Sequence, residues 1–318
     1  MNREFIEKII EEVKAKIPEE LRDILTVEVK EIIKDNDTRL HGVIIQAPEQ
    51  NVTPTIYLED MLKAMPEGAE LSDMADNIIG TYLKGMMNAP RLEDISIDYE
   101  DIKDRLQIQI ADAGRNRDRL KDLVYKPLDN GMVMLAYVVI REDNEGSYQF
   151  AITKDLARDK DYDMDRLFDR AMANTIAKNA PVMTDMRSMI MSMEEGSGIN
   201  PLKEGFNVRK GEPMYVLTNS SSHLGAAVLY YPHVQQNIAE ALKDNYYVLP
   251  SSKHEVIIIP ESAGINLKAM QDMVKDANKS FVDDRDVLSD RVLKYDREKQ
   301  RLTEPKPLER GGSDRGDR

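Results

Sequence analysis

The chain contains no cysteine and no tryptophan, and aromatic residues make up only 6% of its 318 positions. Without cysteine, the protein has no disulfide, no thiol nucleophile and no cysteine-ligated zinc or iron–sulfur site. Aliphatic residues and 18 methionines must therefore fill the core. Because methionine is flexible, we expect such a core to pack adaptably.

Long apolar runs and concentrated positive charge are absent as well. No apolar stretch approaches the roughly 18 residues that span a membrane, and the N-terminus alternates charged and apolar residues, unlike a signal peptide. The net charge is -14, and no dense basic stripe offers a face for a phosphate backbone. These absences predict a cytoplasmic protein that binds neither nucleic acid nor a membrane.

Phosphate-binding loops are missing too. Gly196-Ser197-Gly198 lacks the third glycine of a dinucleotide-binding fingerprint, it does not lie between a strand and a helix, and no GK[ST] motif occurs. We therefore expect no nucleotide, and no other pattern in the sequence indicates a cofactor.

What the sequence does contain is a series of helix-like and strand-like segments. Helical periodicity covers 2–17, 59–65, 72–87, 99–113, 163–177, 233–243 and 266–278. Strand-like runs cover 26–33, 39–46, 54–58, 132–140, 148–153, 214–218, 226–231, 246–249 and 255–259, with a last hairpin around 294–298. Short turns join most of these strands, so we predict an α+β fold of antiparallel hairpins packed with amphipathic helices.

A stretch rich in glycine, proline and charge interrupts this pattern. We expect an N-terminal α+β module over 1–193, a linker or long loop over 194–212 and a C-terminal α+β module over 213–303. Residues 304–318 are polar and rich in glycine and proline, which predicts a disordered tail. The sequence leaves open whether the two modules share one core.

The segment 248–262, VLPSSKHEVIIIPES, gathers the residue types of an active site. A base beside a serine activates the hydroxyl in hydrolases, so Ser251, Ser252, His254 and Glu255 are candidate catalytic residues. However, adjacent strand residues point to opposite faces, and serines after a proline also serve as turn residues. We expect the segment to turn a corner between two strands, with a polar binding site or catalysis as the alternatives.

Three of the four histidines lie in the C-terminal part of the chain. Together with Glu255, His223, His233 and His254 have the composition of a two-histidine, one-carboxylate metal site. His254 and Glu255 also begin an HExxH motif, but Ile258 occupies its closing position and the segment has the pattern of a strand. These residues are candidate metal ligands only if the fold brings them together.

Several short motifs resemble those of an uncharacterised bacterial family, one of the domain-of-unknown-function families of Gram-positive gut anaerobes that are often carried near mobile elements. The motifs are AGRNRDRL (113–120), ITKDL (152–156), AMANT (171–175) with Pro181, MYVLTN (214–219), GAAVLYY (225–231), LPSSKHEVIIIP (249–260) and VLSDRVLKYDRE (287–298). Lys253 departs from the apolar residue expected there. The resemblance implies one fold unit in a bacterial cytoplasm, and it implies no activity and no catalytic residue.

The failure of each catalytic signature favours a non-enzymatic protein that binds another protein or a peptide. Sheet edges and a methionine-rich segment, Met183 to Met193, suit such contacts. The alternative is a hydrolase or a metal-dependent enzyme that uses the C-terminal serine, histidine and glutamate cluster.

Overall fold

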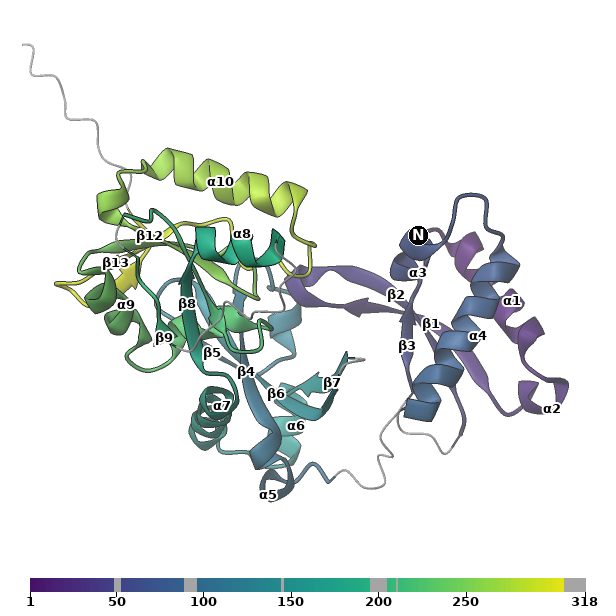
Figure 1. Ribbon diagram of the computed structural model, residues 1–318. Helices are drawn as coiled ribbons and strands as arrows, with labels where there is room; N and C mark the ends of the chain where they lie inside the picture. The colour runs from purple at the N-terminus through teal and green to yellow at the C-terminus, as the bar shows by residue number, and fades with distance from the viewer. Residues whose placement is uncertain (49–52, 89–95, 144–145, 195–204, 210, 306–318) are drawn as a thin grey trace, which may run out of the picture. The chain divides into compact units, whose positions relative to one another are not determined.

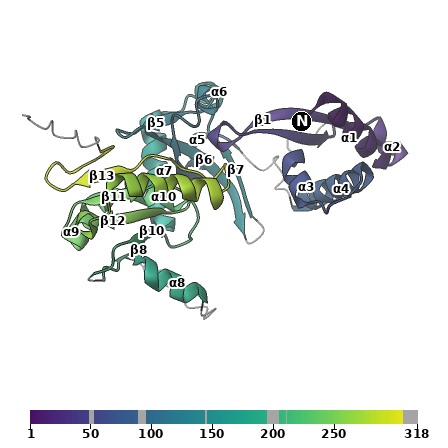
Figure 2. The ribbon, with the colours of Figure 1, turned by 90° about the horizontal axis from the view of Figure 1, so that it is seen from above.

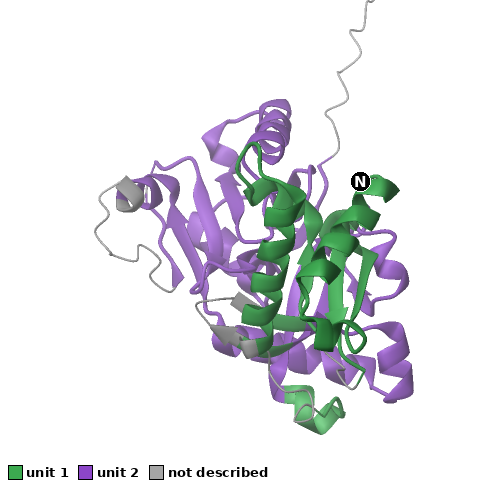
Figure 3. Cartoon of the chain, turned by 90° about the vertical axis from the view of Figure 1, so that its right-hand side faces the viewer, with its two compact units in different colours: residues 1–103, 139–149 green, residues 104–138, 150–318 purple. Residues whose placement is uncertain are grey.

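A computed structural model of the chain describes residues 1–48, 53–88, 96–143, 146–194, 205–209 and 211–305 (Figure 1). Helices pack with three sheets that are built largely from antiparallel strand pairs, which confirms the α+β class. The chain divides into two compact units, coloured separately in Figure 3. Unit 1 comprises Met1–Lys103 and Val139–Gln149, and unit 2 comprises Asp104–Val138 and Phe150–Arg318.

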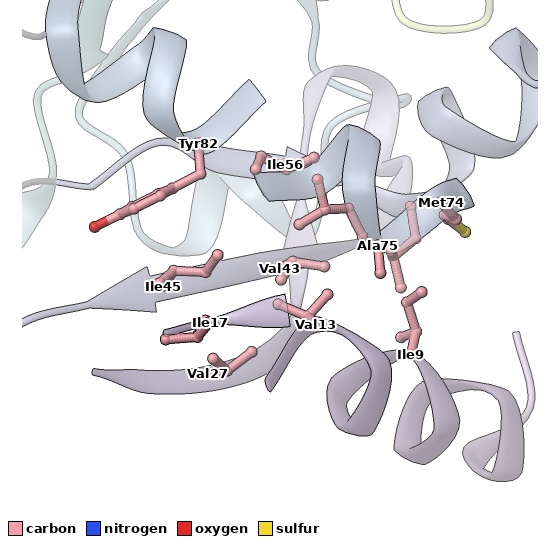
Figure 4. Packing of buried hydrophobic residues seen from close by; sticks show 12 residues of the cluster. Ile9, Val13, Ile17, Val27, Val43, Ile45, Ile56, Met74, Ala75 and Tyr82 are labelled. Atoms are coloured by element: carbon pink, nitrogen blue, oxygen red, sulfur yellow. The ribbon is translucent and has the colours of Figure 1, made fainter. Parts of the chain in front are cut away.

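Unit 1 is a three-stranded sheet covered by helices. Its elements are α1 (Arg3–Lys16), α2 (Glu19–Arg22), β1 (Thr26–Ile33), β2 (Arg39–Gln46), β3 (Thr55–Tyr57), α3 (Leu58–Ala64) and α4 (Leu71–Asn88). Asn2 caps α1 by accepting the N–H of Phe5 at 2.8 Å. Aliphatic side chains of α1 and α4 pack against alternate residues of the strands, including Val27, Val43 and Ile45 (Figure 4).

The first hairpin forms where the sequence predicts it. β1 and β2 pair antiparallel along their whole length, from Thr26 opposite Gln46 to Ile33 opposite Arg39. The connection runs through Asp35–Asp37, and Asn36 adopts a left-handed conformation with φ 60°. Asparagine tolerates this conformation better than most residues, which is why the DND triplet suits the turn.

The next sheet has four strands and carries two helices, and it belongs to unit 2 apart from Val139–Gln149, which are assigned to unit 1. Its elements are β4 (Leu106–Asp112), β5 (Tyr125–Pro127), β6 (Met132–Asp143), β7 (Gly146–Ala151), α6 (Lys154–Asp159) and α7 (Met164–Lys178). The expected helix over 99–113 is wrong: helix α5 ends after one turn (Tyr99–Ile102), a short 3-10 helix covers Lys103–Arg105, and Leu106–Asp112 form β4.

The second part of unit 2 is a seven-stranded sheet in the order β14-β13-β11-β12-β10-β8-β9. Its strands are β8 (Pro181–Asp185), β9 (Gly205–Phe206), β10 (Tyr215–Asn219), β11 (Tyr246–Leu249), β12 (Val256–Pro260), β13 (Leu293–Asp296) and β14 (Arg301–Thr303). Helices α8 (Met186–Glu194), α9 (Val234–Leu242) and α10 (Leu267–Ser280) accompany it. Helix α10 lies across one face of the sheet (Figures 1 and 2), with Met270 and Val274 packed on Leu249 and Ile259.

One further expectation differs from the structure. The strand expected over 226–231 is wrong, because this segment is a 3-10 helix, η5 (Gly225–Tyr230), whose first five residues are fully covered. Within the methionine-rich segment, Met183 is buried in β8, and α8 begins at Met186.

The division into units also differs from the modules drawn from the sequence. Strand β8 precedes the expected linker, yet it pairs with β10, which follows it. Of the expected linker, 195–204 and 210 lie outside the described residues, as do residues 306–318 of the expected tail. Among the described helices, none combines the length and the apolar composition that a bilayer-spanning segment requires.

Candidate functional site

The segment 250–255 connects β11 to β12, which pair antiparallel, so the expected corner between two strands is confirmed. A distant segment before β13 fixes its backbone. Lys253 donates its N–H to the carbonyl of Asp286 at 2.8 Å, and Leu288 donates to the carbonyl of Ser251 at 3.0 Å. Ser252 and Val287 form an isolated bridge. The corner is therefore one side of a small antiparallel ladder.

Both ring nitrogens of His254 face other groups of the protein. Nδ1 accepts the N–H of Leu224 at 3.2 Å, which places the proton of the neutral ring on Nε2. Nε2 lies 3.6 Å from Oδ1 of Asp286. Burial lowers the pKa of His254, and the charges of His223 and Lys253 lower it further, while Asp286 opposes them. Burial and the neighbouring charges therefore favour the neutral form of the His254 ring over its protonated form.

A second imidazole and a lysine complete this cluster. The rings of His223 and His254 lie 5.1 Å apart at an angle of 42°. Asn219 holds the backbone beneath His223 by donating to its carbonyl at 2.8 Å. Lys253 and Asp286 form an ion pair of 2.9 Å. Asp286 thus faces both Lys253 and His254.

The serines of the corner face groups other than the imidazole. Ser252 is buried, its hydroxyl accepts the backbone N–H of His254 at 3.0 Å, and it hydrogen-bonds the side chain of Glu255. Burial raises the pKa of Glu255, and the charge of Asp286 raises it further. The carbonyl of Ser251 accepts the backbone N–H of Leu288. The geometry accounts for Ser252 and His254 as structural partners, and it does not arrange them as nucleophile and base.

The candidate metal ligands come together only in part. His223 and His254 are neighbours, whereas His233 begins α9 as its N-cap, with a left-handed φ of 64°. Among the residues that the structure describes, no group of three histidine, aspartate or glutamate side chains is placed to hold a metal ion. The prediction of a metal site therefore has no geometric support in this part of the chain.

One buried polar cluster of unit 2 was not expected from the sequence. Asp112 ends β4, and its Oδ2 accepts the hydroxyl of Ser289 at 2.8 Å and Nη2 of Arg291 at 2.7 Å. Arg291 also donates to the carbonyl of Asn130 at 3.0 Å. Arg115 and Asp290 form an adjoining ion pair of 2.6 Å.

Two of the motifs that carry the family resemblance, 113–120 and 287–298, therefore meet in space. The signal that was available in the sequence is an aspartate directly after the alternating run QIQIA, which marks the end of a strand.

A second unexpected feature is the outer edge of β1. Along an antiparallel ladder, hydrogen-bonded pairs alternate with non-hydrogen-bonded pairs. Lys34 donates its N–H to the carbonyl of Thr38 at 2.8 Å, and these two residues form the next pair after Ile33 and Arg39 in the register of β1 and β2. The even-numbered residues of β1 therefore bond to β2, and the odd-numbered Val27, Val29 and Glu31 direct their N–H and C=O groups outward.

These outward groups are open in the part of the chain that the structure describes. β1 ends its sheet, and none of the described backbone or side-chain groups hydrogen-bonds the outward N–H or C=O of Val27, Val29 or Glu31. β1 is eight residues long. Such an edge is a template for another strand.

The outer edge of β4, in contrast, is covered. Thr175 of α7 accepts the N–H of Ile108 at 3.0 Å, and Asn174 donates to the carbonyl of Leu106 at 3.0 Å. The terminal strands of the seven-stranded sheet, β14 and β9, have only three and two residues. β1 therefore differs from these edges in being both long and open.

Comparison with known proteins gives a family and no activity. Residues 2–297 match the model of a family described as a family of unknown function, DUF5688. No curated protein and no solved structure matches the chain. The match covers nearly the whole chain and all but the last residue of the motifs that suggested an uncharacterised family, so the chain belongs to the DUF5688 family.

Proposed function

We propose that this protein is a non-enzymatic binding protein that pairs with an extended segment of a partner protein along the outer edge of β1. The observation that carries the proposal is the set of outward backbone groups of Val27, Val29 and Glu31 on an eight-residue strand. An extended peptide that adds to such an edge gains main-chain hydrogen bonds, and its alternate side chains supply specificity.

The side chains of β1 define which segment would fit. On the face turned away from α1 and α4, Glu28 and Lys30 form an ion pair of 2.5 Å and remain 44% and 59% exposed. Charges on an edge strand reject unselective pairing. A strand that places a lysine opposite Glu28 and a glutamate or aspartate opposite Lys30 is favoured, because opposite charges across a ladder stabilise it and like charges destabilise it.

The non-enzymatic part of the proposal rests on the corner at 250–255. A general base needs a nitrogen within reach of the proton it removes, and Nδ1 of His254 accepts a backbone N–H instead. The proposed compartment is the bacterial cytoplasm, in keeping with a chain that lacks cysteine.

The test is selection of binding peptides with a matched pair of variants. A display library of extended peptides of about eight residues is selected on the full chain, and each binder is retested on Val29→Pro and Val29→Ala. Proline removes the outward N–H without touching the bonds to β2, since edge strands tolerate proline on their open side. Alanine shortens the same side chain but keeps the N–H.

We expect Val29→Pro to weaken the selected peptides at least tenfold and Val29→Ala to weaken them by less than threefold. Amide hydrogen exchange should slow at Val27, Val29 and Glu31 when peptide is bound. The proposal falls if the chain is monomeric and no peptide is selected, or if the selected peptides bind both variants equally well.

A further inference from the structure

We infer that the segment bound along β1 is β1 of a second copy of this chain, so that two chains form a symmetric dimer through an antiparallel pair of β1 strands. This inference rests on the proposed function and names its partner. It follows from the register that the backbone and the charges of β1 allow.

The backbone restricts that register first. Two β1 strands can pair antiparallel only if outward-facing residues meet outward-facing residues, because only they have N–H and C=O groups to exchange. In β1 these are the odd-numbered residues Val27, Val29 and Glu31, as the bond from Lys34 to Thr38 establishes. Registers that place odd residues opposite even ones are thereby excluded.

The charges then select among the remaining registers. In a symmetric pair of strands, the residue at the centre faces the same residue of the second copy. If the centre is Glu28 or Glu31, two glutamates face each other. If the centre is Lys30, two lysines face each other. A pair centred on Val29 places Glu28 opposite Lys30 of the second copy, twice by symmetry. Like charges directly opposite destabilise a ladder, and opposite charges stabilise it.

The register centred on Val29 also satisfies the backbone. Val29 exchanges both hydrogen bonds with Val29 of the second copy, and Val27 does so with Glu31 on each side. Glu28 and Lys30 then fall in the non-hydrogen-bonded pairs, where side chains lie closest across the ladder. Among the registers that pair more than three residues of each β1, only the one centred on Val29 satisfies hydrogen bonding and charge at the same time.

The two-fold axis keeps the faces of the sheets continuous. Val27 and Val29 belong to the face that packs on α1 and α4, so the pairing brings Val29 beside Val29 of the second copy on that face. Glu28, Lys30 and Thr26 fall on the opposite face. A symmetric interface in which the same surface contacts itself is the commonest arrangement of soluble oligomers.

The experiment is a charge exchange read out by sedimentation of the full chain at several concentrations. Glu28→Lys alone sets lysine opposite lysine, and Lys30→Glu alone sets glutamate opposite glutamate, so each variant should weaken dimerisation at least tenfold. The double variant Glu28→Lys/Lys30→Glu restores opposite charges and should dimerise within about threefold of the original chain.

Mixing the two single variants gives the sharpest result. Lysines at 28 and 30 of one chain then face glutamates at 30 and 28 of the other, so an equimolar mixture should form a mixed dimer although neither variant dimerises alone. The matched control is the exposed ion pair of α10, where Lys268→Glu and Asp272→Lys reverse the same charges at 74% and 51% exposed positions. These controls should leave the dissociation constant within twofold.

Three outcomes would overturn the inference: a monomer at every concentration up to several hundred micromolar, a dimer that the single variants leave intact, or a mixture that stays monomeric. The outcome for the proposed function is separate. If the chain is monomeric yet binds selected peptides in a manner that Val29→Pro abolishes, strand addition stands and the second copy is the wrong partner. If neither occurs, both proposals fail.

Discussion

Asp112 and Arg291 are 179 residues apart in the sequence, yet Oδ2 of the aspartate lies 2.7 Å from Nη2 of the arginine. The contact joins the end of β4 to the segment that leads into β13. The side chain of Asp112 is only 8% exposed and that of Arg291 is 30% exposed. Within unit 2, the pair therefore fastens the four-stranded sheet to the seven-stranded one through a largely buried charge.

Replacing Arg291 with methionine should destabilise the fold. Methionine fills a similar volume but leaves the Asp112 carboxylate without its cation, and an uncompensated buried charge is costly. We expect a loss of about 2–4 kcal/mol in the free energy of unfolding, measured by urea denaturation. Arg301→Met is the control, because Arg301 is 61% exposed and lies 3.6 Å from Asp129, which is 78% exposed. It should cost less than about 1 kcal/mol, and equal losses in the two variants would contradict the prediction.

Gly131 has a backbone conformation and a neighbour that both require glycine. Its φ is 77°, and a Cβ atom there would lie 2.4 Å from Nη1 of Arg291. Gly131→Ala should therefore lower the free energy of unfolding by about 1–3 kcal/mol through strain and displacement of the arginine. Gly80 in α4 has nothing within 4 Å of the same position. Gly80→Ala should instead stabilise the protein by about 0.5–1 kcal/mol, and thermal unfolding of both variants distinguishes the two effects.

The fold class and most elements could be predicted from the sequence because their signals are local. The hairpin of β1 and β2 has a turn residue at Asn36 that takes the required conformation. The expected corner at 250–255 and helices such as α10 also depend on patterns within a few residues. Such patterns are fixed by backbone sterics and periodicity and need no knowledge of the tertiary structure.

The prediction of a helix over 99–113 was wrong because the apolar residues of this segment fit the period of a helix and that of a strand. Ile102, Leu106 and Ile110 are spaced by four residues, which suits a helix face, but the same spacing suits one face of a strand. Gln107, between Leu106 and Ile108, belongs to the alternation that identifies β4. A single turn of helix does form at the start, at Tyr99. Because the four-residue spacing fits both structures, it could not show where the helix ends and the strand begins.

The prediction of a strand over 226–231 was wrong for a different reason. Its run of apolar residues is buried as a 3-10 helix against β10, and a continuous apolar run has no period that separates strand from helix. A Cβ atom on Gly225 would lie 2.5 Å from the carbonyl oxygen of His254 and 2.7 Å from the backbone nitrogen of Asn219, so this segment packs closely against the backbone of its neighbours. The contact between Asp112 and Arg291 could not be predicted from the sequence either, since no local sequence pattern identifies a tertiary contact.

His254 should make the stability of the protein depend on pH. Burial holds the pKa of His254 below its ordinary value of 6.5, with His223 and Lys253 lowering it and Asp286 opposing. The unfolded chain therefore takes up this proton at a higher pH than the folded chain, and stability is lost as the pH falls below about 6.5 towards the folded pKa.

His254→Asn removes this titration while asparagine can still accept the N–H of Leu224. We expect a loss of about 1 kcal/mol at pH 7.5, from the ring contacts, and a smaller difference from the original chain at pH 5. Urea unfolding at both pH values gives the comparison. His233→Asn changes an exposed residue whose left-handed backbone suits asparagine, and it should keep the original pH dependence. An unchanged slope in His254→Asn would refute the prediction.

Glu255 should have the opposite effect on how the stability of the protein depends on pH. Burial raises its pKa above 4.5, the charge of Asp286 raises it further, and the hydrogen bond from Ser252 only partly compensates. The folded chain thus holds this proton up to a higher pH than the unfolded chain does, and the associated stability is present below about pH 4.5 and lost as the pH rises through the folded pKa.

Glu255→Gln keeps an oxygen that can accept from Ser252 and removes the buried charge. At pH 7.5 the variant should therefore be more stable than the original chain, by on the order of 1 kcal/mol, because an unpaired buried charge is unfavourable. As the pH falls towards 4.5 that gain should shrink, since the raised pKa lets the original carboxyl take up its proton more readily in the fold than in the unfolded chain. Glu4→Gln, at a 73% exposed position of α1, should show no such gain at either pH. If Glu255→Gln instead destabilises the protein at pH 7.5, the carboxylate is a required ionic partner in this cluster, and the corner at 250–255 must be reconsidered as a site that uses its charge.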